Sequence, residues 1–233
     1  MERPENARRA FWKLADASQY TPSMRAATTK SLQETIIAQL NGASRIDAFE
    51  AAKEVWNIDG NAVAKQLIET LKRGRRAFNR AAAAHAMQAV REIHVIMALE
   101  STLRNKSEYP DVRGHAAETL AHHHRKATHG LLLKTLMDPS KHVRFWCAFA
   151  LGQMRERKAV PILRLLMSDQ RQVRGFHPVA KEAADAIGEI ERRESGRRCH
   201  WCVRDRRPLQ LEMRADRARS RRTTRKGGMS AKA

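Results

Sequence analysis

"HVRFWCAFALGQMRERKAVPILRLLMSD" (residues 142–169) predicts the fold, because it contains two helical patterns separated by a short polar turn. In the first pattern Val143, Cys147 and Leu151 follow one another at four-residue spacing, which places their side chains on one helical face. In the second pattern Pro161 suits the first turn of a helix, and large apolar residues follow it as a stripe. The stretch is therefore predicted to be a helical hairpin with two apolar faces to bury.

The same pattern stands 31 residues earlier, in "DVRGHAAETLAHHHRKATHGLLLKTLMD" (residues 111–138). At this offset Val143 and Arg144 fall on Val112 and Arg113, and the small and large apolar residues that follow also match. A helical pair that repeats every 30 to 35 residues or so is typical of a stacked solenoid, in which neighbouring hairpins cover each other's apolar faces.

Weaker copies of the unit extend in both directions along the chain. Upstream, Arg80 opens a copy with the same small and apolar positions, and an earlier copy begins near Asp47. Downstream, Val173 restarts the unit, but its small pair returns only at Ala183 and Ala184, so about six residues are inserted. We expect an all-α fold, a short right-handed α-α superhelix of four to five helical hairpins.

The predicted boundaries divide the chain into three segments. Residues 31–192 are expected to form the solenoid, opened by an unpaired helix at "SLQETIIAQL". Residues 1–30 are expected to be an N-terminal extension with at most one loose helix. Residues 193–233 are expected to be a disordered basic tail, because they contain few apolar residues and no sustained period.

The motif "VR..AA..L", followed by a proline- or glycine-led "LL..L.D", resembles the HEAT-like repeats of the phycobilisome lyase type over roughly residues 44–192. The resemblance implies an armadillo-like α-solenoid whose surface binds another macromolecule. Similar repeats occur in deoxyhypusine hydroxylase, where His-Glu pairs just after the Val-Arg position bind iron. Here that position reads Gly114-His115 and Phe145-Trp146, and the chain contains no His-Glu dipeptide. This departure argues against the hydroxylase.

Positive charge is concentrated at the end of the chain. The formal net charge is +20, and residues 192–233 hold 15 Lys or Arg against 4 Asp or Glu. Such a segment attracts polyanions by counterion release, although a solvated extension without a partner and a targeting signal are alternatives. The arm residues predicted to contact nucleic acid or an acidic partner are Arg219, Arg221, Arg222, Arg225 and Lys226.

A second predicted contact surface lies on the solenoid. In repeats of this type the second helix of each unit usually lines the concave side, so the resemblance assigns partner contact to outward basic residues of those helices. These are Lys65, Lys72, Arg104, Lys134 and Arg164. We expect a protein partner on this surface and DNA or RNA on the tail.

Four arginines recur at one position of successive units: Arg80, Arg113, Arg144 and Arg174. Such a ladder could hold phosphates, but each arginine stands near an acid between repeats. These acids include Asp111, Asp138 and Asp169. We therefore expect repeat-to-repeat ion pairs to occupy the ladder.

No metal or cofactor is predicted. The histidines His115, His122, His123, His124, His129 and His142 gather in two units, but they form no HExxH helix and are interpreted as surface residues. His122 to His124 are expected to favour a helix C-terminus through partial protonation. Cys199 and Cys202 form a CxxC pair without a second ligand pair, and whether they bind a metal stays open.

The sequence predicts a non-catalytic scaffold or adaptor, since no nucleophile elbow, phosphate loop or dinucleotide-binding turn is present. One alternative is an alkylpurine DNA glycosylase of the HEAT-like type, for which Trp56 and Asp59 are the nearest Trp and carboxylate pair. Trp56 is instead expected in the core, and Asp59 is expected to close the turn "NIDGN" (residues 57–61), where Gly60 suits a helix stop. A lyase-like accessory or chaperone is a second alternative.

The sequence contains no long apolar run and no apolar leader. We therefore expect a soluble, cytoplasmic chain without membrane contact.

Overall fold

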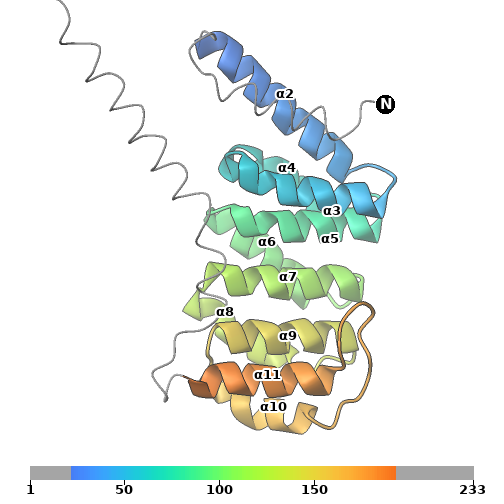
Figure 1. The fold of residues 1–233 in the computed structure, drawn as a ribbon, viewed down its shortest axis with the longest axis vertical. Helices are drawn as coiled ribbons and strands as arrows, with labels where there is room; N and C mark the ends of the chain where they lie inside the picture. Colours follow the sequence, from blue (N-terminus) through green and yellow to red (C-terminus); the bar gives the residue numbers. More distant parts are fainter. Residues whose placement is uncertain (1–21, 193–233) are drawn as a thin grey trace, which may run out of the picture. The chain divides into compact units, whose positions relative to one another are not determined.

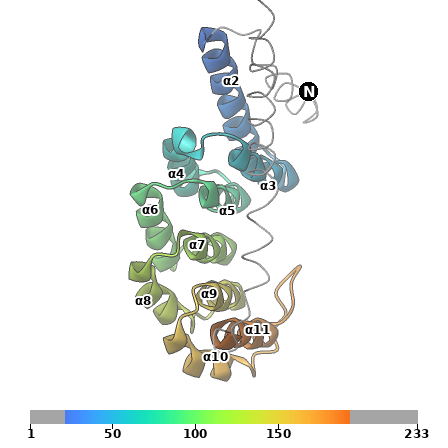
Figure 2. The ribbon, with the colours of Figure 1, turned by 60° about the vertical axis from the view of Figure 1, so that its left-hand side comes forward.

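The computed structural model describes residues 22–192, which fold into α-helices stacked in two layers (Figures 1 and 2). The first layer contains α3 (Arg45–Glu54), α5 (Ala77–Ala86), α7 (Pro110–His123), α9 (Lys141–Gln153) and α11 (Val179–Glu191). The second layer contains α4 (Ala64–Arg73), α6 (Ile93–Arg104), α8 (Lys126–Thr135) and α10 (Val160–Leu166). The predicted all-α solenoid is confirmed.

The chain before the first hairpin forms α2 (Pro22–Leu40). This helix is longer than the predicted opening helix, because it begins at Pro22, inside the segment assigned to the extension. Its last turns bury Ile36 and Leu40 against the array. No helix among the described residues has the length and apolar character to cross a membrane.

Small side chains let the helices of the first layer approach closely. Ala81, Ala82, Ala83 and Ala84 on α5 are all fully buried. At Gly152 on α9, an added Cβ would lie 2.8 Å from the Cα of Ala186 on α11, so the two helices pack nearly backbone to backbone. Cys147 is also fully buried, which confirms its predicted core position.

The second layer buries one leucine at the same register of successive repeats. Leu99, Leu132 and Leu163 are fully buried on α6, α8 and α10. Pro161 stands in the first turn of α10, as the sequence predicts, where its missing N–H leaves no unmet hydrogen bond. The amphipathic pattern of the second helices therefore closes the core from the other side.

The last repeat departs from the others between α10 and α11. The predicted insertion forms a loop in which Gln172 and Pro178 make an isolated bridge and Val173 is buried (Figure 1). In α11 only Ala183 of the predicted small pair is buried, while Ala184 is exposed. The predicted core position of Ala184 was therefore wrong, and Ala186 is buried instead.

Candidate functional site

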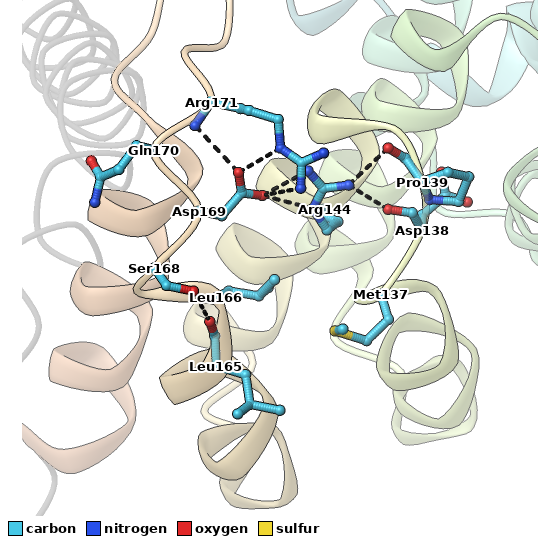
Figure 3. Close-up of a pocket in the computed structure, with 10 residues that line it drawn as sticks. All are labelled: Met137, Asp138, Pro139, Arg144, Leu165, Leu166, Ser168, Asp169, Gln170 and Arg171. Carbon is cyan, nitrogen blue, oxygen red and sulfur yellow. Dashed lines mark hydrogen bonds and ion pairs between the residues drawn. The ribbon is translucent and has the colours of Figure 1, made fainter.

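An ion pair closes the open end of each of the two central hairpins. Arg113, at the start of α7, donates to the carboxylate of Asp138, in the turn after α8, at 2.6 and 3.3 Å. Arg144, at the start of α9, donates from Nε and Nη2 to Oδ2 of Asp169, after α10, at 2.9 and 2.6 Å (Figure 3). All four side chains are at most 7% exposed. Carboxylates therefore occupy these two arginines as predicted, but each acid ends the same unit as its arginine, so the predicted repeat-to-repeat pairing was wrong.

The ends of the arginine ladder differ from the prediction. Arg80 pairs with Glu108 at 2.8 Å, and Asp111 pairs instead with Arg45 at 3.2 Å. Arg174 is exposed in the loop before α11. Because the central and first arginines are occupied by carboxylates, the ladder does not offer a row of phosphate sites.

An open pocket lies beside the second of these ion pairs (Figure 3). Met137 and Leu165 lie on opposite sides of it, at the turn after α8 and on α10. Both side chains are more than half exposed. The polar wall includes Arg144 and Asp169, which pair with each other, and the apolar wall includes Met137, Leu165 and Leu166.

The predicted basic contact residues of the solenoid all lie on the second layer and are exposed: Lys65, Lys72, Arg104, Lys134 and Arg164. Within α4, α6, α8 and α10, seven Lys or Arg stand against two Asp or Glu. Within α3, α5, α7, α9 and α11, seven stand against nine. The helices of the two layers thus carry opposite net charge.

Some predicted residues lie outside the described part of the chain. These are the arm residues Arg219, Arg221, Arg222, Arg225 and Lys226, and the pair Cys199 and Cys202.

A cluster on the first layer was not predicted. His85 on α5 lies beside His115 and Glu118 on α7, and the ligand atoms of the three side chains all lie within 4.8 Å of one another. His115 Nδ1 is 2.8 Å from Oε2 of Glu118, and His85 Nδ1 is 3.5 Å from the same oxygen. The three side chains are 12 to 23% exposed. We name these residues the His–His–Glu cluster.

The cluster keeps its carboxylate ionised. Burial raises the pKa of Glu118, but hydrogen bonding and charge from His115 and His85 outweigh burial and lower that pKa to about 2. Gln88 Nε2 lies 3.0 Å from the same His85 Nδ1 that faces Glu118, so this nitrogen donates to Glu118 in one tautomer and accepts from the Gln88 amide in the other. The cluster therefore holds one negative charge beside two imidazole rings.

Aromatic rings fix the two imidazoles in place. Phe49 on α3 contacts both, with ring centroids 6.0 Å from His85 and 5.2 Å from His115. Trp146 on α9 lies 5.7 Å from His115 on the other side. A Cβ at Gly114 would lie 2.5 Å from Cδ1 of this indole, so a glycine is needed for the ring to pack on α7.

The remaining histidines do not join this cluster, and one prediction for them was wrong. His123 donates from Nε2–H to the carbonyl oxygen of Met87, and burial followed by the charge of Arg91 lowers its pKa to about 4. His123 is therefore neutral near pH 7 and does not add charge to the helix end. His129 makes a separate pair with Glu156, 2.5 Å apart.

Trp56 and Asp59, the pair considered for a glycosylase, follow the end of α3, and Trp56 does not lie in the core as expected. Trp56 is 50% exposed, not buried, because the chain leaves α3 for a 3₁₀ turn (Val55–Asn57). Asp59 caps the following 3₁₀ turn by accepting from the backbone N–H of Asn61, which confirms its turn role. Gly60 begins that 3₁₀ turn and does not end a helix.

Comparisons with known proteins bear on the repeats. A family model described as HEAT repeats matches residues 96–176. No curated protein matches the chain. Among solved structures, human deoxyhypusine hydroxylase in complex with glycerol is similar over 72% of this chain, with 16% sequence identity and a TM-score of 0.49. The match spans 66% of that protein's chain.

Proposed function

We propose that this chain, a HEAT-repeat protein over residues 96–176, is a non-catalytic scaffold that binds an acidic macromolecule on its second helical layer. Stacked helical repeats present extended surfaces of this kind to partners. The observation that carries the proposal is the charge difference between the layers, with seven basic and two acidic residues on the second. A positive surface of this form favours encounter with an acidic partner.

The basic tail is the second part of the proposal. Residues 193–233 act as an arm that contacts nucleic acid or the acidic partner without reading its sequence, because their charge excess suits counterion release. The arm and the second layer then make separate contributions to binding. Removing the arm should abolish binding of nucleic acid, while the partner bound on the second layer is retained.

Charge reversal on the second layer tests the proposal. The variant combines Lys134→Glu and Arg164→Glu. The matched control combines Lys53→Glu and Lys181→Glu, which change net charge equally on α3 and α11 of the first layer, where both lysines are 60% exposed. Proteins captured from a lysate by the parent and the control, and lost only by the second-layer variant, support the proposal. Equal capture by all three chains contradicts it.

The arm is tested with labelled DNA and RNA oligonucleotides and a chain truncated after Glu191, at the end of α11. We expect full-length affinity to fall about 10³-fold or more over roughly 50 to 200 mM salt, and truncation to remove it. Tight binding by the truncated chain would move nucleic-acid contact onto the solenoid.

The glycosylase alternative has one observation in its favour, the exposure of Trp56. It requires the purified chain to release a base from alkylated DNA, and the variant Trp56→Ala to lose this activity. A scaffold releases no base. The accessory alternative requires a coloured ligand that copurifies with the chain. If the chain releases no base and no coloured ligand copurifies with it, the scaffold proposal is retained.

A further inference from the structure

The His–His–Glu cluster has the chemical composition of a metal site. Two imidazole nitrogens and one carboxylate oxygen are ligands that zinc and similar first-row transition ions prefer, whereas calcium and magnesium prefer oxygen ligands alone. Within the described part of the chain, these are the residues whose His, Cys, Asp or Glu atoms converge in a group of three. We propose that His85, His115 and Glu118 bind a divalent transition-metal ion of the zinc class.

The distances suit such an ion. With metal–ligand bonds of about 2.0 to 2.1 Å, tetrahedral ligand atoms lie roughly 3.3 to 3.4 Å apart. His85 Nδ1 is 3.5 Å from Oε2 of Glu118. His115 Nδ1, at 2.8 Å from that oxygen, needs to move about half an ångström to exchange its hydrogen bond for a shared ion. The ligand nitrogens of His85 and His115, which lie within 4.8 Å of each other, must also reach this separation.

The backbone and the neighbouring rings hold the ligands ready. His115 and Glu118 stand three residues apart on α7, so one helical face presents both. Phe49 and Trp146 restrict the rotation of His115 from two sides. Ligands that packing has already ordered lose little further entropy on binding an ion.

The charge and access of the cluster also favour a cation. The Glu118 carboxylate is 12% exposed, with apolar rings beside it, so it attracts an ion of charge +2 in surroundings of reduced polarity. In the tautomer in which His85 Nδ1 carries a lone pair, this nitrogen binds the cation in place of its hydrogen bond from the Gln88 amide. His85 is the most exposed of the three ligands, at 23%, and three protein ligands leave the fourth tetrahedral position to water.

Zinc binding by the full-length chain tests the proposal, in a parent that carries Cys199→Ser and Cys202→Ser so that these thiolates add no affinity. Competition with a chromophoric chelator measures zinc affinity, and the visible absorption of bound cobalt reports nitrogen and oxygen ligands. The variants are His85→Gln, His115→Gln and Glu118→Gln, each checked for helix content by circular dichroism. The matched control is His129→Gln, which breaks an imidazole–carboxylate pair of similar exposure without a third ligand.

We expect the parent to bind one zinc ion, and each variant to lose more than about 100-fold in affinity, because outer-shell partners alone are worth about 10- to 100-fold. The control should bind like the parent. Glu118→Gln keeps the size of the side chain, so it reports on the ligand if a histidine variant does not fold. Absence of zinc binding by the parent overturns the proposal, as does equal affinity of a folded Glu118→Gln chain.

Discussion

Arg144→Met should lower the free energy of unfolding by about 3 kcal/mol, at the lower end of the 3 to 5 kcal/mol typical for removing one partner of a buried ion pair. The substitution removes two hydrogen bonds to Asp169 and two more to the carbonyls of Asp138 and Pro139. Asp169 would stay 7% exposed but would keep its contacts with Arg171, which softens the loss.

Arg171→Met is the matched control, since Arg171 binds the same carboxylate from a side chain that is 62% exposed. Exposed ion pairs contribute about 0 to 1 kcal/mol, so this variant should lose no more than that. Urea unfolding followed by far-ultraviolet circular dichroism measures both changes. If Arg144→Met and Arg171→Met cost the same, burial does not determine the value of these ion pairs, and the reasoning is refuted.

The same ion pair predicts a pH dependence. Burial raises the pKa of Asp169, but hydrogen bonds from Arg171 and Arg144 outweigh it and hold that pKa at about 2, below its ordinary value of 3.8. A lowered carboxyl pKa stabilises the folded chain above about pH 4, and this stabilisation is lost as the pH falls through 2. Asp169→Asn should remove this part of the acid dependence.

Three further outcomes are expected. Gly114→Ala should destabilise the chain by about 1 to 3 kcal/mol, because its Cβ would overlap the neighbouring indole, whereas Gly130→Ala, with open space around it, should stabilise α8 by about 0.5 to 1 kcal/mol in thermal unfolding. Cys147 should resist alkylation until the chain unfolds, because burial raises the pKa of its thiol, and mass spectrometry of its peptide would reveal early labelling. Leu163→Ala should cost about 2 to 5 kcal/mol and Leu165→Ala, on a side chain 66% exposed, close to nothing; comparable losses would contradict the assigned core.

The repeat period predicted the fold well, because helical packing depends on spacing. The positions of Val112 and Val143, fully buried in successive repeats, follow from the offset alone. Trp56 could not be placed in this way. A 3₁₀ turn has three residues per turn, so the change of helix type at Val55 rotates the next side chain away from the face that the α-helical period predicts.

The His–His–Glu cluster was missed although the repeat offset contained a signal for it. His85 stands 33 residues before Glu118, and Arg80 stands 33 residues before Arg113, so both steps join equivalent positions of neighbouring first helices. Histidines close together in sequence do not predict the cluster, because His85 belongs to a different repeat from His115 and Glu118. The distances between these side chains depend on helix packing, which only the structure provides.

The ion pairs at the hairpin ends bear on how such an array can change length during evolution. Arg113 and Asp138 belong to one unit, and so do Arg144 and Asp169. A duplication or deletion that begins and ends at equivalent positions therefore carries both charges of a pair together. The shortened or lengthened array inherits no buried charge without its partner, so whole repeats can be gained or lost at a small electrostatic cost.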